Sequence, residues 1–439
     1  MDGDFRSLAG TLQHLFTEGV AALNRQLDFV HRERKLSACV LVRLLVFGWI
    51  GRPQRSLASL AEEAQVSAQA LQQRLTDRAV ALFKALLAEA LTKVFTARRP
   101  LIPLLHRFTA IEVHDATQLV LPACLAEKYP ACGGLDGKRG KAGWKLPLRF
   151  DVLSGELRPF ELVAGKTSDH NAVAEPLADL KAGMLYLADL GYFCLERLHE
   201  VVQRGAHYVT RLPARVNVTG ADGPGQLVGL WLQKHSGDVV DTTVRIGKDG
   251  ELTTRLVALR VPEAVAAERR RKLQAKSRKR GREISANQWA LCDWWVGITD
   301  LPATELSAEE IRTLYGLRWQ VELLFKHWKQ AGGMGTVHGR TAASVQVEYL
   351  AKLLGVIVTH WQALLAGGPL EGKNRLAVHR RVCAACDRLA EMFKIGGGLA
   401  AMVVILKELA IALNRIRRRA RRKKAPSTRQ RLYGKRVRN

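Results

Sequence analysis

The spacing of hydrophobic and polar residues predicts helices throughout the first hundred positions. Two short amphipathic segments, residues 56–64 and 67–75, are separated by a Gln-Val pair, and each begins with a serine that can cap a helix. This cadence is typical of a helix-turn-helix, and it is equally typical of any helical hairpin. The arginines beside it that could meet phosphates are Arg52, Arg55 and Arg74.

From about residue 107 the pattern changes to that of strands. An apolar run over 108–114 is expected to end at Asp115, and a second over 184–188 is expected to end at Asp189. The alternating segment 145–152 is also read as a strand.

Two further segments lie between those strands. Residues 157–162 are read as the hairpin partner of the strand over 145–152. Helical spacing returns over residues 170–182.

A change of composition marks residues 213–290. Gly, Asp, Thr and Val come first and predict a small antiparallel sheet, and a dense basic run follows over 268–283. Residues 289–299 return to a strand pattern that contains the pair Trp294 and Trp295.

An amphipathic helix is predicted after Ser307, and its charged residues carry the most information. Arg318, Glu322, Lys326 and Lys329 lie three or four positions apart, so they form a ridge beside the apolar face. The alternative is an ordinary solvated helix face. Helices are expected to continue to about residue 415. A basic tail follows, which is expected to be disordered or to order only on nucleic acid.

The net charge of the chain says more about its function than its length does. The chain has 439 residues, which predicts about two to four domains. Its 68 Lys and Arg against 41 Asp and Glu give a net charge of +27, which indicates a polyanionic partner, most often nucleic acid. No uncharged apolar run of membrane-spanning length is present, so no membrane partner is expected. The seven scattered cysteines fit a reducing cytoplasm, and the lone Cys383–Cys386 pair lacks the further ligands of a zinc site.

Three acidic residues form the candidate chemical centre. Asp115 and Asp189 follow two apolar strands, and side chains at strand ends share a crevice in open α/β sheets. Glu322 could reach this crevice from a helix. Three carboxylates from separate elements can hold two divalent cations about 3.5–4 Å apart, and magnesium suits such a set together with a substrate phosphate. The alternative is that either aspartate is only a turn residue.

Taken together, these residues resemble the transposases of bacterial insertion sequences of family four. Tyr315, Arg318, Glu322 and Lys329 match the spacing of that family's Y-R-E-K signature. Asp115, Asp189 and Glu322 match its DDE triad.

The resemblance implies a multi-domain α/β fold, with an RNase H-like mixed sheet flanked by helices and interrupted by a β-rich insertion. The division that it suggests is a helical N-terminal DNA-binding domain over 1–104, a catalytic core over 105–212 and 291–365, the insertion with its basic run over 213–290, and a helical C-terminal region with the basic tail over 366–439.

The same resemblance implies cut-and-paste transposition through a hairpin intermediate. The triad would be catalytic and would bind two Mg²⁺ ions, for which Mn²⁺ can substitute. Trp295 would stack on a flipped base, and Trp294 is the second candidate for this role. For both tryptophans the alternative is packing in the core. The residues expected to contact DNA phosphates are Tyr315, Arg318, Lys326, Lys329 and Lys145. For Lys145 the alternative is a solvated strand face.

The implied partners are the terminal inverted repeats and the target, both double-stranded DNA. A dimer is implied in the DNA complex, at work in the bacterial cytoplasm on the nucleoid. Two other functions stay open at this point. One is an RNase H-like nuclease without strand transfer, and the other is a catalytically idle DNA-binding regulator derived from a transposase.

Overall fold

The chain forms two compact units, each assembled from separate stretches of sequence. Unit 1 comprises residues 1–100, 116–168 and 320–422, and unit 2 comprises residues 101–115, 169–319 and 423–439. The computed structural model describes residues 2–30, 35–132, 141–168, 177–221, 223–365, 367, 372–416 and 428–432. Most of the basic tail therefore lies outside the described residues. The division into five domains stays a prediction.

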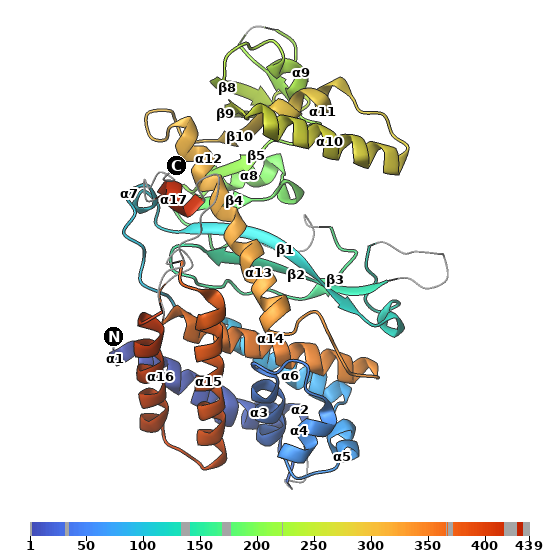
Figure 1. Cartoon of the computed structure of the whole chain (residues 1–439), viewed down its shortest axis with the longest axis vertical. Helices are drawn as coiled ribbons and strands as arrows, with labels where there is room; N and C mark the ends of the chain where they lie inside the picture. The colour runs from blue at the N-terminus through green and yellow to red at the C-terminus, as the bar shows by residue number, and fades with distance from the viewer. Residues whose placement is uncertain are drawn as a thin grey trace. The chain divides into compact units, whose positions relative to one another are not determined.

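Unit 1 is mainly helical (Figure 1). Its N-terminal elements are α1 (Asp2–His14), the π-helical turn η1 (Leu15–Gly19), α2 (Val20–Leu27), α3 (Ala38–Trp49), α4 (Leu57–Glu63), α5 (Ala68–Gln73) and α6 (Asp77–Leu91). Its later helices are η2 (Ala123–Leu125), α13 (Trp319–Ala331), α14 (Ala342–Leu364), α15 (Arg375–Lys394) and α16 (Leu399–Asn414). Its strands are β2 (Ala142–Asp151), β3 (Val163–Ala164) and the second half of β1 (Ile111–Leu121).

Helix α14 forms the core of unit 1. It packs against α3 and α6. It is long and apolar enough to cross a membrane, but 83% of its most apolar window is buried inside the protein. A core helix explains this burial, because its apolar residues already have protein partners.

Unit 2 carries a mixed sheet. Its strands are the first half of β1, β4 (Leu185–Ala188), β5 (His207–Arg211), β6 (Asn217–Thr219), β7 (Gln226–Leu227), β8 (Val239–Ile246), β9 (Leu252–Arg260) and β10 (Trp294–Thr299). They follow the order β1-β4-β5-β10-β9-β8-β6-β7. The pairs β1–β4 and β4–β5 are parallel, and the others are antiparallel.

The same unit contains ten helices and helical turns among its described residues. They are α7 (Pro103–His106), η3 (Leu190–Tyr192), α8 (Leu195–Gln203), α9 (Val228–Leu232), α10 (Glu263–Arg280), α11 (Ala286–Ala290), η4 (Leu291–Asp293), α12 (Ala308–Tyr315), η5 (Gly316–Arg318) and α17 (Thr428–Leu432). The mixed sheet, the antiparallel insertion and the helical terminal regions confirm the predicted fold class.

Three local predictions about strands and helices differ from the structure, one in whole and two in the part that the structure describes. Strand β1 does not end at Asp115 but continues to Leu121, because its second half lies beside β2 in the sheet. Residues 157–162 pair with β2 only at their start, through the bridge Phe150–Leu157 and the hydrogen bond from Arg158 N–H to the Arg149 carbonyl. Pro159 follows, and β3 is the strand that pairs with β2 on this side. Proline has no N–H to donate to a ladder, so the chain rejoins the sheet later.

The third concerns the helix expected over 170–182. Residues 170–176 lie outside the described part, and 177–182 form isolated turns, in which Leu180 N–H donates to the Leu177 carbonyl.

The helix expected after Ser307 is interrupted. Ser307 and Glu310 form a capping box at the start of α12, as a Ser-x-x-Glu pattern predicts. Helix α12 then ends at Tyr315, and the 3-10 turn η5 precedes α13. Glycine at 316 disfavours a continuous α-helix, and its carbonyl accepts a hydrogen bond from Thr428. The signature residues therefore lie on three elements rather than one.

Candidate functional site

Two aspartates occupy matching positions on neighbouring parallel strands of unit 2. In the register between β1 and β4, His114 lies opposite Ala188. Asp115 directly follows His114, and Asp189 directly follows Ala188. Neighbouring strands lie about 4.8 Å apart, so the two carboxylates start from adjacent points of the sheet.

A stack of aromatic rings holds this corner of unit 2. The His114 ring lies 3.8 Å from the Tyr192 ring, and its Nδ1 lies 3.0 Å from the Tyr186 hydroxyl. Tyr192 belongs to η3, the turn that follows Asp189. Sequence reasoning missed these positioning residues. The signal was present, since His114 directly precedes Asp115 and Tyr192 stands three residues after Asp189.

The Arg318 guanidinium faces both aspartates. Its Nη1 donates to Asp115 Oδ2 at 3.0 Å, and its Nε lies 3.9 Å from Asp189 Oδ1. The side chains of Arg318 and Asp115 are 15% and 17% exposed, whereas that of Asp189 is 45% exposed. One cation therefore faces two carboxylates. These three residues, called the aspartate group below, are open to solvent on the side of Asp189.

Tyr315 extends this group toward β10. Its ring lies 5.9 Å below the Arg318 guanidinium and 6.0 Å from the Trp295 ring, edge to face. Burial raises the pKa of the Tyr315 hydroxyl to about 12, so the phenol is protonated at neutral pH. A protonated phenol can donate a hydrogen bond to an anion.

Both tryptophans of the predicted stacking pair are buried. Trp295 is 8% exposed and Trp294 is 3% exposed. A Cβ at Gly297 would approach the Trp295 indole to 2.6 Å, so the glycine makes room for that ring. Trp294 lies under the Arg260 guanidinium at 4.4 Å. The contact with Tyr315 associates Trp295 with the aspartate group, and no such contact is recorded for Trp294 among the described residues.

The remaining predicted residues belong to unit 1. Glu322 and Lys329 are partly buried on α13, and Lys326 is exposed on the same helix. Burial lowers the pKa of the Lys329 ammonium. The position of Glu322 relative to the two aspartates of unit 2 stays a prediction.

Lys145 is not on a solvated strand face, so that alternative is wrong. It is 7% exposed on β2, and its ammonium donates to the Thr167 carbonyl. The side chain would have to leave this bond before it could reach a phosphate.

The donor set at the aspartates suits a hard divalent cation. Two carboxylate oxygens already face one positive group, and oxygen is the ligand that magnesium prefers. Within the described residues, no group of three or more His, Cys, Asp and Glu side chains is close enough to hold a metal ion. Cys386 is buried and Cys383 contacts His379, so the CxxC pair also makes no metal cluster there.

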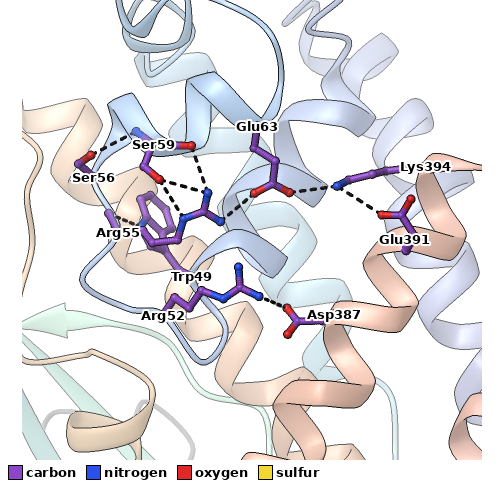
Figure 2. A network of polar contacts seen from close by, with 9 residues as sticks. All are labelled: Trp49, Arg52, Arg55, Ser56, Ser59, Glu63, Asp387, Glu391 and Lys394. Carbon is purple, nitrogen blue, oxygen red and sulfur yellow. Dashed lines mark hydrogen bonds and ion pairs between the residues drawn. The ribbon is translucent and has the colours of Figure 1, made fainter.

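The helix pair α4–α5 has the predicted caps, but its arginines are engaged within the protein (Figure 2). Arg55 donates to Glu63 at 2.8 Å and to Ser59, and Glu63 also accepts from Lys394 of α15. Arg52 pairs with Asp387 at 2.8 Å. Two of the three arginines expected to meet phosphates therefore already have carboxylate partners.

The aspartate group and Tyr315 combine three chemical properties. They have carboxylates that can bind cations, a guanidinium whose N–H groups fit phosphate oxygens, and a phenol that stays protonated. These are the groups that phosphodiester chemistry needs, because the substrate carries negative charge and more develops on its oxygens during reaction.

Comparison with known proteins agrees with this chemistry. The family described as transposase DDE domain matches residues 108–357, more than half of the chain. The transposase for insertion sequence element IS231E of Bacillus thuringiensis subsp. finitimus is 31% identical over 358 residues, covering 75% of this chain and 74% of the relative. The transposase for IS231F of Bacillus thuringiensis subsp. israelensis is 28% identical, covering 76% and 75%. The putative transposase InsL for IS186A of Escherichia coli K12 is 26% identical, covering 50% and 60%.

Proposed function

The chain belongs to the DDE-domain transposases of insertion sequences, enzymes that cut DNA and transfer its strands, and from this premise we propose that Asp115, Asp189 and Glu322 are its catalytic triad. The observation that carries the proposal is the Arg318 guanidinium, which faces the carboxylates of both aspartates. Glu322 enters from the sequence signature alone. Membership of family four remains a prediction.

DDE transposases use divalent metal ions, and the three carboxylates would hold two Mg²⁺ ions, for which Mn²⁺ can substitute. Bound there, the ions would supply Lewis-acid activation of the attacking oxygen and stabilisation of the leaving oxygen. Asp115 and Asp189 supply oxygen ligands from adjacent strands. Arg318 would then exchange its carboxylate contacts for phosphate oxygens, which its planar fork fits equally well.

Four further side chains are proposed to contact the phosphates around the cleaved bond. The Tyr315 hydroxyl would donate a hydrogen bond to a phosphate oxygen, because its raised pKa keeps the phenol protonated. Lys326 and Lys329 lie on the same helix as Glu322, and Lys145 would join them only after leaving the Thr167 carbonyl.

The reaction is proposed to pass through a hairpin at the element's end. After the first nick, the freed 3′-hydroxyl would attack the opposite strand, and a base would have to leave the stack to allow this turn. Trp295 is the proposed stacking residue because its ring contacts Tyr315, beside Arg318. Two DNA ends would be held by a dimer, and the place of action would be the nucleoid.

The triad is tested in a cleavage assay on DNA that carries the flanks of the gene, with magnesium. Asp115→Asn, Asp189→Asn and Glu322→Gln should each lower nicking at least ~10³-fold, about 4 kcal/mol of transition-state stabilisation, while DNA binding persists. Asp249→Asn is the control, because Asp249 is exposed in a turn between β8 and β9. A triad variant that nicks at the wild-type rate would refute the assignment.

The hairpin step is tested in the same assay with two neighbouring substitutions. Trp295→Ala should slow hairpin formation more than the first nick, and Trp294→Ala should affect both steps alike. Equal slowing of both steps by Trp295→Ala would exclude base stacking there. Products without joined strands would point to a nuclease, and binding without any cleavage would point to an idle regulator.

A further inference from the structure

Helix α10 of unit 2 is the most strongly charged element outside the aspartate group. Its 18 residues, Glu263–Arg280, include eight Lys or Arg and two Glu. Ala266 is its only buried residue. A helix with so little apolar surface is not held by core packing, so its charges need another explanation.

The first half of α10 is anchored by two arginines. Arg269 donates to the carbonyls of Cys292 and Trp294, at 3.3 and 2.8 Å. Arg270 bonds Asp293 and also donates to Glu263 at 2.9 Å. These bonds hold the helix against η4 and the start of β10. Basic residues are therefore used structurally in this half.

The second half carries six exposed basic residues, and four of them have no acidic partner in the part of the chain that the structure describes. Arg271, Lys272, Lys276, Arg278, Lys279 and Arg280 are all exposed. Glu268 contacts the first two. Among the described residues, no carboxylate lies within ion-pair distance of the other four. Figure 1 shows this end of α10 extending beyond the strands of the insertion.

Helical geometry gathers four of these charges on one face. At about 100° per residue, Arg271, Lys272, Arg278 and Lys279 point into an arc of about 120° opposite Ala266. Lys276 lies four residues after Lys272 and three before Lys279, and like charges at these spacings destabilise a helix by roughly 0.2–0.5 kcal/mol per pair. The helix dipole offsets part of this near the C-terminus. Such a face is costly to the isolated protein, and a polyanion would relieve the repulsion.

We propose that this outward face of α10 binds the phosphate backbone of duplex DNA, away from the bond that is cut. The inference rests on the proposed function, since that function supplies the DNA. Duplex DNA is favoured over a single strand because α10 has no aromatic residue on which bases could stack. The helix is about 27 Å long, which matches roughly eight base pairs along a duplex. Lysine and arginine contacts to phosphates carry no sequence information.

The test compares two variants that each lose four charges. The first replaces Arg271, Lys272, Arg278 and Lys279 by Gln. The control replaces Lys181, Lys234, Arg245 and Lys248 by Gln, which are exposed on other elements of the same unit. Affinity is measured against salt concentration on an element end and on an unrelated duplex.

The slope of log affinity against log salt should fall by about 3–4 for the α10 variant, since each phosphate contact contributes about 0.9. Affinity at moderate salt should fall ~10–100-fold, equally on both DNAs. The control should change the slope by less than about 1. A third variant, Arg271→Lys with Arg278→Lys, keeps the charge and should keep the slope. The melting temperature of the α10 variant should stay close to the wild type's, because the variant loses the repulsion by Lys276 and also the ion pairs of Arg271 and Lys272 with Glu268.

The proposal would be overturned if the slope of log affinity against log salt were equal for the α10 variant and the control. A loss of affinity for the element end alone would also overturn it. If the fourfold variant melts early, Arg278→Gln alone decides the matter: the proposal requires a slope change near 1, and no change rejects it. The triad is judged separately. Nicking by Asp115→Asn would reject the triad and leave the salt slopes untouched, and unchanged slopes with an inactive Asp115→Asn would reject only the role of α10.

Discussion

Unit 1 and unit 2 each contain a group of opposite charges, and the two groups are built differently. In unit 1, Lys352 Nζ lies 2.6 Å from Glu348 Oε1, and both side chains are at most 1% exposed. Glu348 also accepts from His338 and from the Gly339 backbone N–H, and Lys352 donates to the Thr336 carbonyl. Both oxygens of this carboxylate have donors from the protein itself.

The group in unit 2 is held more loosely. Arg318 faces both Asp115 and Asp189, and the second contact is long, at 3.9 Å. Asp189 is also close to half exposed. The Glu348–Lys352 pair is closed, because both oxygens of its carboxylate already accept hydrogen bonds from the protein. The group in unit 2 is open, because Asp189 is partly exposed, and its carboxylates can accept another cation. The comparison separates structural charges from those available for chemistry.

Breaking the closed pair should have the largest effect on stability. Glu348→Gln leaves the Lys352 ammonium buried without a carboxylate, which should cost about 3–5 kcal/mol in urea unfolding. Glu309→Gln is the matched control, since Glu309 pairs with Arg312 at the surface and is 64% exposed. Its cost should stay below about 0.5 kcal/mol. A loss under about 1 kcal/mol for Glu348→Gln would mean that the buried pair is not structural.

Acid should weaken unit 1 through two neutral histidines. Burial lowers the pKa of His327 and of His360 from 6.5 to about 4 in each case. The unfolded chain therefore binds more protons than the folded one between these values. Stability should be fully present above about pH 6.5 and fall as pH drops toward 4, by about 2 kcal/mol per histidine between pH 6.5 and 4.5.

The measurement is urea unfolding across this pH range. His360→Gln should flatten the dependence by one histidine's share, whatever it does to stability at neutral pH. An unchanged dependence would show that the pKa of His360 is the same in the folded and the unfolded protein.

Removing the cation of the open group should have a smaller and metal-dependent effect. Without metal, Arg318→Gln leaves Asp115 and Asp189 to repel each other, and should lower stability by about 1–2 kcal/mol. Magnesium should then raise the variant's melting temperature more than the wild type's, since it replaces the missing charge. Equal magnesium shifts in both proteins would indicate that the carboxylates do not share a cation site.

Exposed pairs set the lower end of the scale. Arg52 and Asp387 lie 2.8 Å apart with side chains 55% and 51% exposed (Figure 2). Asp387→Asn should cost about 0.2–1 kcal/mol, and the loss should vanish at high salt. A double-mutant cycle with Arg52→Gln isolates the pair. A coupling above about 2 kcal/mol would show that this pair behaves like the buried one.

The sequence predicted well those features of the fold that depend on residues within one helical turn, such as the starts of helices. Ser56, Ser67 and Ser307 cap helices because a serine before an apolar period satisfies backbone N–H groups within one turn. Asp189 follows its strand as expected. Asp115 does not end β1, because the length of a strand depends on which neighbours pair with it, and β2 comes from later in the sequence.

Long-range contacts account for what sequence reasoning missed at the site. The role of Arg318 as partner of both aspartates depends on bringing position 318 to positions 115 and 189, which no spacing reveals. Lys145 looked solvated because strands alternate, yet its whole strand is buried. The DDE resemblance pointed to the correct family, since four signature residues and two aspartates are far more specific together than any of them alone.

The most direct test of the account is a crystal structure of the protein bound to an element end in Mn²⁺, with the ions located by anomalous scattering. The account predicts two peaks about 3.5–4 Å apart, ligated by Asp115, Asp189 and Glu322, with Arg318 turned toward a phosphate. Peaks elsewhere, or a Glu322 carboxylate more than about 10 Å from both aspartates with DNA bound, would contradict it.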